Sequence, residues 1–219
     1  MGFVDSRSVT DGEVVEADVC IIGGGAAGIT LAREFQDQDF RVVLLESGGD
    51  GFDLETQNLY RGESVGRSNY PLEGCRLRYY GGTTNHWANW CSTFDPEDFE
   101  VRPWIPYSGW PFSRASLDSA YERAHVLTGL GPYQYDELSY WTTPGGGEPL
   151  KFSHGTLESC IIQIGTPRAV FGRKYHDVME RSKNTRVMLW ANMTELEFAP
   201  DSDRIHSARV KTLAGNEFS

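Results

Sequence analysis

The feature that most constrains what this chain can fold into is a set of spaced glycines between an apolar run and a helical pattern. Residues 19–22 have the composition of a buried strand. They are followed by Gly23, Gly25 and Gly28, the G-x-G-x-x-G spacing, and then by apolar residues at helical intervals. Glycine-rich turns are common, but a strand, a glycine turn and a helix in this order open a β-α-β unit of the kind that binds dinucleotides.

Each glycine has its own physical role in such a turn. Gly23 lets the chain leave the strand sharply, Gly25 leaves room for a pyrophosphate to approach the backbone, and Gly28 lets the helix pack closely on the strand. The N-terminus of the helix then presents unpaired N–H groups and a partial positive charge to the phosphates.

A second predicted strand ends on an acid. Residues 42–45 are apolar, and Glu46 follows Gly28 at close to the expected spacing of about 20 residues. A carboxylate there accepts hydrogen bonds from a ribose and repels a 2′-phosphate, so the pattern favours FAD or NAD over NADP. The alternative reading is a glycine turn in an α/β domain without a ligand.

Composition is typical of a globular protein and excludes several function classes. The chain has 219 residues, 39% of them apolar and 23% charged, which suits one large domain or one and a half small ones. Its formal net charge of −11 argues against nucleic acid and anionic membranes as partners. No apolar run approaches the ~18 residues of a spanning helix, and the polar, acidic N-terminus is unlike a secretory signal.

The cysteines favour a reducing, cytoplasmic setting. They are scattered, with no C-x-x-C pair and no zinc spacing, at Cys20, Cys75, Cys91 and Cys160. We expect Cys20 to be buried in the first strand. The sequence also contains no metal-ligand spacing, no Ser/His/Asp order and no G-x-S-x-G.

Beyond residue 47 the pattern predicts few long elements. The polar lead-in predicts a short edge strand at 13–15, and Ser113 is a predicted N-cap of a helix that ends at Gly129 or Gly131. Further predictions are a strand at 157–164, a helix at 173–182, and an antiparallel meander at 187–191, 193–198 and 205–213. A fourth meander strand is expected to begin after the turn at residues 215–216.

A second stretch that could bind a ligand lies in the long irregular region, at residues 76–90. Gly81 and Gly82, followed by two threonines, offer several backbone N–H groups in a small space, which suits a second approach to phosphate or to the edge of a flavin ring. His86 lies in this loop between Asn85 and Trp87. A role for His86 at a ligand and a purely structural role remain equally open from the residues alone.

Together, these stretches resemble the glucose-methanol-choline (GMC) family of FAD-dependent oxidoreductases, most closely its pyranose-oxidase-like and sugar-dehydrogenase-like branch. The resemblance runs from about residue 13 to residue 219. It is carried by ADVCIIGGGAAGITLAREF, RVVLLESGG, YYGGTTNHWANW, SGWPFSRASLDSAYERA and TRVMLWANMTELEF. The first two segments occur in many FAD proteins, whereas the third, followed by Ser-Gly-Trp-Pro and a helix, is far more specific.

The resemblance implies an α/β, Rossmann-like, three-layer FAD/NAD(P)-binding domain with an antiparallel β-meander and long loop insertions. It implies that Glu46 holds the adenosine ribose and that Met193 lies where the meander presents backbone to adenine. It assigns the pyrophosphate to Gly23, Gly25, Ala26, Ala27 and Gly28. It places along the pyrophosphate and the flavin Gly81, Gly82, Asn85 and His86.

In pyranose oxidases a histidine in a similar Thr-His-Trp context is bonded covalently to the flavin. His86 matches that position, although Asn85 replaces the threonine. Related sugar dehydrogenases keep a similar histidine without the bond. We therefore expect FAD as the cofactor and favour non-covalent binding over attachment at His86.

The family's reaction transfers a hydride from the CH–OH group of an alcohol or sugar to flavin N5. Its base is a histidine near the C-terminus of much longer chains, and nothing here matches it, so no catalytic residue is assigned. We expect an inactive fragment, truncated before the substrate domain is complete. Its expected parts are 1–60, the first β-α-β unit; 61–150, the flavin-contacting loop and helical insertion; and 151–219, the return to the FAD domain with the meander.

Two other functions remain open at this point. A flavin monooxygenase or an amine oxidase fits the first 50 residues equally well, but not the loop at 76–112. A non-catalytic FAD-binding fragment is the reading we favour for the isolated chain. The expected partner of the parent protein is a small alcohol or sugar, with an unassigned electron acceptor.

Overall fold

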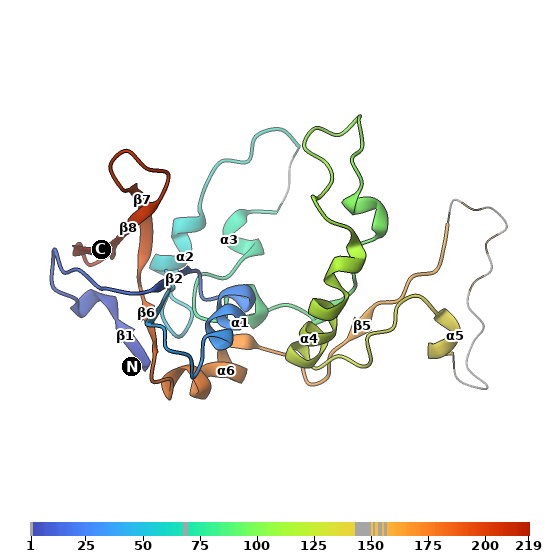
Figure 1. Ribbon diagram of the computed structural model, residues 1–219, viewed down its shortest axis with the longest axis horizontal. Helices are drawn as coiled ribbons and strands as arrows, with labels where there is room; N and C mark the ends of the chain where they lie inside the picture. Colours follow the sequence, from blue (N-terminus) through green and yellow to red (C-terminus); the bar gives the residue numbers. More distant parts are fainter. Residues whose placement is uncertain (1, 68–69, 143–149, 151, 153–154, 156) are drawn as a thin grey trace. The chain divides into compact units, whose positions relative to one another are not determined.

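A computed structural model describes residues 2–67, 70–142, 150, 152, 155 and 157–219 (Figure 1). The chain divides into two compact units. Unit 1 contains the residues up to 87 together with residues 170–219, and unit 2 contains residues 88–169. The three ranges predicted from the sequence have different boundaries, and their functional assignment stays a prediction.

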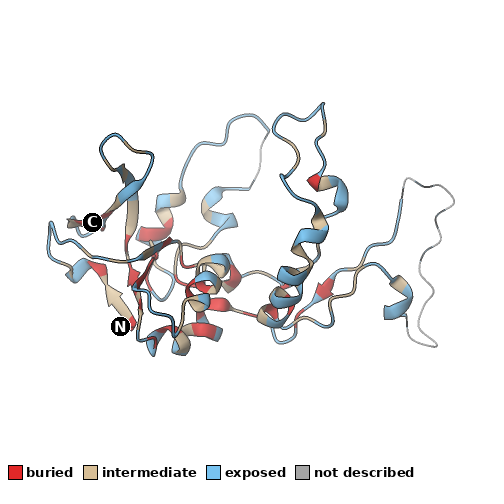
Figure 2. Ribbon diagram, in the orientation of Figure 1, coloured by how far each residue is buried: buried red, intermediate tan, exposed pale blue. Residues whose placement is uncertain are grey.

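Unit 1 is built on a four-stranded parallel sheet. Its strands lie in the order β1 (Gly2–Asp5), β6 (Thr185–Leu189), β3 (Val42–Leu45) and β2 (Val19–Ile22). Every residue of β3 is buried, because it has a neighbouring strand on each side and is covered on both faces (Figure 2). A continuous apolar run is the pattern expected of such a strand.

Two helices cover one face of this sheet. α1 (Ala26–Glu34) contacts β2 and β3, and α6 (Phe171–Glu180) contacts β1 and β6. The helices also pack on each other, with the Arg33 guanidinium 4.2 Å from the ring centroid of Tyr175. α6 buries residues spaced about one turn apart, which is the amphipathic pattern of a surface helix.

A three-stranded antiparallel meander covers the opposite face. It consists of β7 (Asn192–Phe198), β8 (Ile205–Lys211) and β9 (Glu217–Phe218). One core joins the sheet to the meander and contains Val43, Leu45, Met188, Ala191, Val210 and Phe218. Helices, parallel sheet and meander form the three layers, so the predicted α/β Rossmann-like class is confirmed.

Two predictions about strands were wrong. The N-terminal edge strand lies at Gly2–Asp5 rather than at 13–15; the Val15 N–H instead donates to the Ser219 carbonyl at 2.7 Å. The strand beginning at Thr185 belongs to the parallel sheet and not to the meander, because it is buried on both faces. A strand does begin after the turn at residues 215–216, as predicted; it is β9, which pairs with β8 and is the third strand of the meander rather than the fourth.

The remaining elements of unit 1 are short. They are η1 (Ser6–Ser8), α2 (Leu54–Gln57), η2 (Asn58–Tyr60), α3 (Leu72–Cys75) and η3 (Gly82–Asn85), where η denotes a 3₁₀ helix. Cys20, expected to be buried, is exposed on β2, which is an edge strand of the parallel sheet. Within the part of the chain that is described, no helix is long and apolar enough to cross a membrane.

Unit 2 has little regular structure. It contains β4 (Trp90–Cys91), η4 (Pro96–Phe99), η5 (Arg114–Leu117), α4 (Asp118–Thr128), α5 (Leu138–Trp141) and β5 (Gln163–Ile164). α4 ends at Gly129, whose φ of +70° is a left-handed cap. The strand predicted at 157–164 is present only at its last two residues. Buried His125 has a structural role, because Nδ1 lies 2.8 Å from the Gly131 carbonyl oxygen.

Candidate functional site

The glycine turn lies at the carboxyl end of β2, where α1 begins. Gly23 has a φ of +102°, and its N–H donates to the Leu45 carbonyl at 2.7 Å. A Cβ added at Gly28 would lie 1.9 Å from the Gly23 carbonyl oxygen, so only glycine lets α1 approach the turn this closely. These are the turning and packing roles that the sequence predicted for the two residues.

Gly25 leaves open space at the N-terminus of α1. It is the N-cap residue of that helix, and a Cβ added there would meet no atom within 4 Å. Ala26 and Ala27 form the first turn, so their N–H groups have no partner within the helix. An open backbone surface beside unpaired N–H groups fits a phosphate group, and the residues present therefore suit a dinucleotide.

Glu46 joins two glycine turns. Its side chain is only 6% exposed. Oε2 accepts a hydrogen bond from the Gly24 N–H at 2.7 Å, and Oε1 accepts one from the Gly48 N–H at 2.9 Å. A carboxylate oxygen has a second lone pair, so Glu46 keeps acceptor capacity for a ligand hydroxyl.

The second sequence stretch contacts the glycine turn directly. The Gly81 N–H donates to the Gly24 carbonyl at 2.8 Å, and a Cβ added at Gly82 would lie 3.1 Å from the Gly25 Cα. Both Gly81 and Gly82 have positive φ, at +93° and +53°. The structure therefore brings together two glycine segments that lie far apart in the sequence.

Polar side chains fix this second loop from within. Thr84 Oγ1 donates to the Gly81 carbonyl at 2.6 Å and accepts from the Phe171 N–H at 3.1 Å, which attaches the loop to the start of α6. Asn85 Nδ2 donates to the Tyr80 carbonyl at 3.0 Å. In this structure the Asn85 amide therefore stabilises the loop.

His86 and Met193 are less tightly placed. His86 follows η3 and is exposed, and among the described residues its ring forms no hydrogen bond or ion pair. Met193 is half-buried at the start of β7, paired with Val210, and packs against the core between sheet and meander. No contact shown here joins either residue to the glycine turn, so their roles at FAD stay predictions.

Tyr80 was missed by the sequence analysis, which carried no signal for it beyond its place before Gly81. Its side chain is 1% exposed and lies beneath the glycine turn, where an added Gly24 Cβ would come within 3.2 Å of Cδ2. Burial raises the pKa of the Tyr80 phenol, and the carboxylates of Asp50 and Glu46 raise it further. The Tyr80 phenol is therefore uncharged, and its ring packs against the glycine turn.

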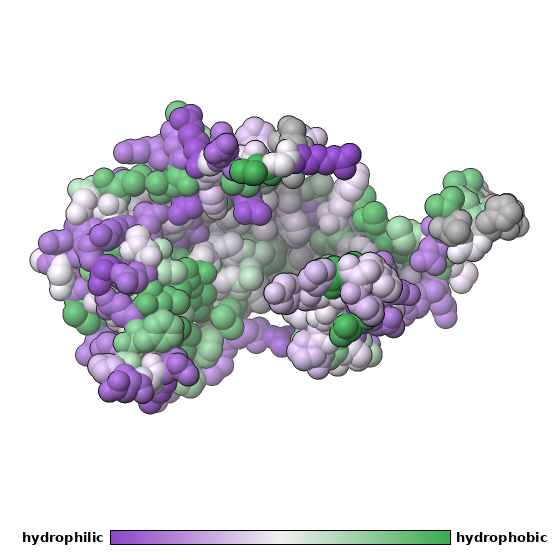
Figure 3. Space-filling view, turned by 90° about the horizontal axis from the view of Figure 1, so that it is seen from above, coloured by the Kyte–Doolittle hydropathy of each residue, from purple (hydrophilic) through white to green (hydrophobic). Residues whose placement is uncertain are grey.

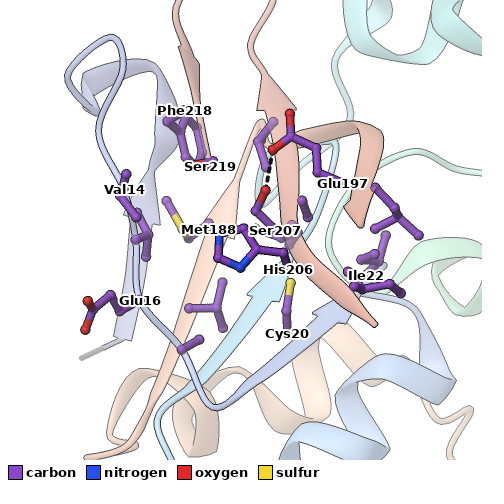
Figure 4. A pocket seen from close by; sticks show the side chains of 18 of the residues that line it. Val14, Glu16, Cys20, Ile22, Met188, Glu197, His206, Ser207, Phe218 and Ser219 are labelled. Carbon is purple, nitrogen blue, oxygen red and sulfur yellow. Dashed lines mark hydrogen bonds between the residues drawn. The ribbon is translucent and has the colours of Figure 1, made fainter. Parts of the chain in front are cut away.

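A cavity of about 800 Å³ lies elsewhere in unit 1, between the sheet and the meander (Figure 4). Cys20, Ile22, Met188 and His206 line it, whereas neither the glycine turn nor Glu46 does. The unpaired N–H groups and the open glycine backbone lie outside this cavity, so it is not the place where the sequence predicts phosphate binding. The surface in Figure 3 shows apolar residues interspersed among hydrophilic ones.

No family model matches the chain. Oxygen-dependent choline dehydrogenases from Paraburkholderia phymatum and Acinetobacter baumannii are each 36% identical to it over 85 residues. The matched region is 38% of this chain and 12% and 13%, respectively, of these relatives.

Two solved structures have a similar fold. Pyridoxine 4-oxidase from Mesorbium loti has a TM-score of 0.50 and 18% identity, and formate oxidase has a TM-score of 0.51 and 17% identity. The matches cover 92% and 96% of this chain but 47% and 44% of the solved structures, so the chain spans less than half of their length. Together with the fold, these sequence and structure matches support the predicted resemblance to the N-terminal FAD-binding portion of the glucose-methanol-choline (GMC) family.

Proposed function

We propose that this chain holds the ADP part of FAD in an oxidoreductase that acts on the CH–OH group of an alcohol or sugar. The observation that supports the proposal most is the open backbone at Gly25, placed between the N-terminus of α1 and the loop at Gly81 and Gly82. The resemblance to the GMC family supports FAD as the dinucleotide.

The pyrophosphate would lie against the backbone of Gly23, Gly25, Ala26, Ala27 and Gly28. The N–H groups of the first turn of α1 would donate to its oxygens, assisted by the partial positive charge of the helix N-terminus. Glu46 would accept from the adenosine ribose with the lone pairs that its bonds to the backbone leave free. The same carboxylate would exclude a 2′-phosphate by repulsion.

The loop around Gly81 would cover the pyrophosphate and reach toward the flavin. Its contact with Gly24 supports this placement for Gly81 and Gly82. Asn85 would act through the loop backbone that it stabilises, and exposed His86 is available to a flavin edge without a covalent bond. The adenine would lie near the backbone of Met193.

When bound, FAD accepts a hydride from the substrate carbon at N5. No residue of this chain is assigned as the base that removes the hydroxyl proton. We therefore propose that the isolated chain oxidises neither alcohols nor sugars, and that binding and orienting FAD is its whole contribution. The proposed substrate class, an alcohol or sugar, is supported by the resemblance to the family, its sugar-oxidising branch included. A cytoplasmic location is proposed separately, from the scattered cysteines.

Competitive titration tests the proposal. FAD and ADP should compete for one site on the 219-residue chain, and 2′-phospho-ADP should bind more weakly than ADP. Glu46→Arg should weaken FAD binding at least tenfold, while Glu158→Arg, the same charge change at an exposed position of unit 2, should leave it unchanged. Equal effects of the two substitutions, or tighter binding of 2′-phospho-ADP, would contradict the assignment of Glu46.

A second measurement separates the proposed reaction class from other FAD enzymes. The complete parent protein should reduce an electron-acceptor dye when given an alcohol or sugar, without any nicotinamide nucleotide. A requirement for NADH or NADPH in flavin reduction would instead favour a monooxygenase.

A further inference from the structure

Trp190, which follows β6 directly, has a left-handed backbone conformation with a φ of +55°. A bulky residue rarely adopts this conformation, because its Cβ crowds the neighbouring backbone. Such strain persists only where the surrounding structure holds it in place. This backbone conformation places the Trp190 side chain against Gly49 and Arg7.

The indole ring of Trp190 lies between Gly49 and Arg7. A Cβ added at Gly49 would come within 2.3 Å of Trp190 Cζ2, so the ring rests directly on the glycine backbone. On the ring, the Arg7 guanidinium carbon lies 3.7 Å from the centroid, which is a close cation–π contact. The ring is therefore fixed between a glycine turn and a cation.

The turn beneath the ring is the one that places Glu46. The Trp190 N–H donates to the Gly48 carbonyl at 2.9 Å, and the Ala191 N–H donates to the Glu46 carbonyl at 2.8 Å. The Gly48 N–H in turn donates to Glu46 Oε1 at 2.9 Å. The segment that carries the indole is thus hydrogen-bonded to the backbone of Glu46 and to the turn that orients its carboxylate.

Arg7 is itself held in place. Its guanidinium donates to both carboxylate oxygens of Asp5, from Nε at 2.9 Å and from Nη2 at 2.7 Å. Asp5 ends β1, which pairs with β6, so the N-terminal strand brings Arg7 over the end of β6. Arg7 and Trp190 also border a cavity of about 180 Å³ that reaches Ser47, the residue after Glu46.

We propose that Trp190 and Arg7 are positioning residues. They hold the Glu46 carboxylate where it can accept a hydrogen bond from the adenosine ribose of the dinucleotide. This inference rests on the proposed function, because it assumes that Glu46 accepts from the ribose. Neither side chain needs to touch the ligand. They act through the turn at Gly48 and Gly49.

The test compares ADP with 2′-deoxy-ADP by isothermal titration calorimetry on the 219-residue chain. The wild-type chain should bind ADP at least about tenfold more tightly, since a hydrogen bond to a charged group is lost with the 2′-hydroxyl. Glu46→Gln sets the ratio expected when the carboxylate is gone. A purely structural defect lowers both affinities equally and leaves their ratio unchanged.

Trp190→Gly is the informative variant, because glycine adopts a φ of +55° without strain and removes only the ring. We expect its ADP to 2′-deoxy-ADP ratio to fall to within about twofold of the Glu46→Gln ratio. Arg7→Ala, at a more exposed position, should lower the ratio about two- to fivefold, as expected for an exposed cation–π contact. Trp104→Gly, at a largely exposed tryptophan of unit 2, is the matched control and should change nothing.

The outcomes separate the two proposals. An unchanged ratio in a folded Trp190→Gly chain, or in Arg7→Ala if the former does not fold, overturns the positioning role and leaves the proposed function standing. A wild-type chain that binds neither ADP nor FAD overturns both. Binding without preference for the 2′-hydroxyl removes the ribose role of Glu46, and the positioning role with it.

Discussion

Replacing Gly28 by alanine tests how closely α1 packs on the glycine turn. The added Cβ would lie 1.9 Å from the Gly23 carbonyl oxygen and 3.3 Å from Leu44 Cδ1. Carbon and oxygen normally approach to no less than about 3.3 Å, so α1 must move by more than about 1 Å. Overpacking costs about 1–3 kcal/mol. Because the opposing atom is backbone and cannot rotate away, we expect a loss near the upper end.

At about 2–4 °C per kcal/mol for a chain of this size, this loss corresponds to a decrease in Tm of about 6–12 °C. Thermal unfolding followed by circular dichroism measures it. Gly25→Ala is the matched control, since its Cβ meets no atom within 4 Å and its φ of −82° suits alanine. We expect its unfolding free energy to change by less than about 1 kcal/mol.

The same pair of variants separates packing from binding. Gly25→Ala should weaken FAD binding while the fold stays intact, because the methyl group occupies the space left for the pyrophosphate. A Gly28→Ala chain that unfolds within about 2 °C of wild type would refute the packing argument. Unchanged FAD affinity in Gly25→Ala would refute the proposed binding of the pyrophosphate against the Gly25 backbone.

Three further predictions follow from the same geometry. Glu46→Gln should lower the unfolding free energy by about 1–3 kcal/mol in chemical denaturation, because an amide NH₂ group faces a buried N–H such as that of Gly24; an unchanged value would contradict the bonding shown here. The Arg7 guanidinium lowers the pKa of Asp5, so this ion pair stabilises the fold above the ordinary aspartate pKa of about 3.9 and is lost as the pH falls through the lower, folded value; carboxyl NMR titration should find the Asp5 pKa back in its usual range in Arg7→Ala. Acid precipitation of the flavin-loaded chain should release all flavin, whereas retention that disappears in His86→Ala would show a covalent bond.

Local patterns predicted the elements that carry the dinucleotide fingerprint. Both strands of that unit, Val19–Ile22 and Val42–Leu45, have the predicted bounds, because a continuous apolar run between turns leaves little freedom in placement. α4 ends at Gly129, one of the two glycines predicted to stop this helix, since a left-handed cap favours glycine.

Elements defined by distant partners were not predictable in the same way. The alternation at Val187 and Leu189 is compatible with a meander or with a parallel strand, and only pairing with β1 and β3 decides between them. The N-terminal strand Gly2–Asp5 is short and lies in a polar segment, so it has no signal apart from its partner β6.

The candidate site likewise has some residues that local sequence predicts and others that depend on distant partners. The glycine spacing and Glu46 can be read from the sequence because the proposed dinucleotide binding requires those residue types at those intervals. The approach of Gly81 to Gly24 depends on a loop that returns from far along the chain. The backbone of Trp190 and its contact with Gly49 depend on tertiary packing, which no local pattern encodes.

The proposed function depends on one contact, between the backbone at the start of α1 and the pyrophosphate of FAD. Amide NMR shifts of the 219-residue chain during titration with ADP test it most directly. We predict that the Gly25, Ala26 and Ala27 amide signals move together and saturate at one equivalent of ADP. Saturable binding that leaves these three signals in place would contradict the account.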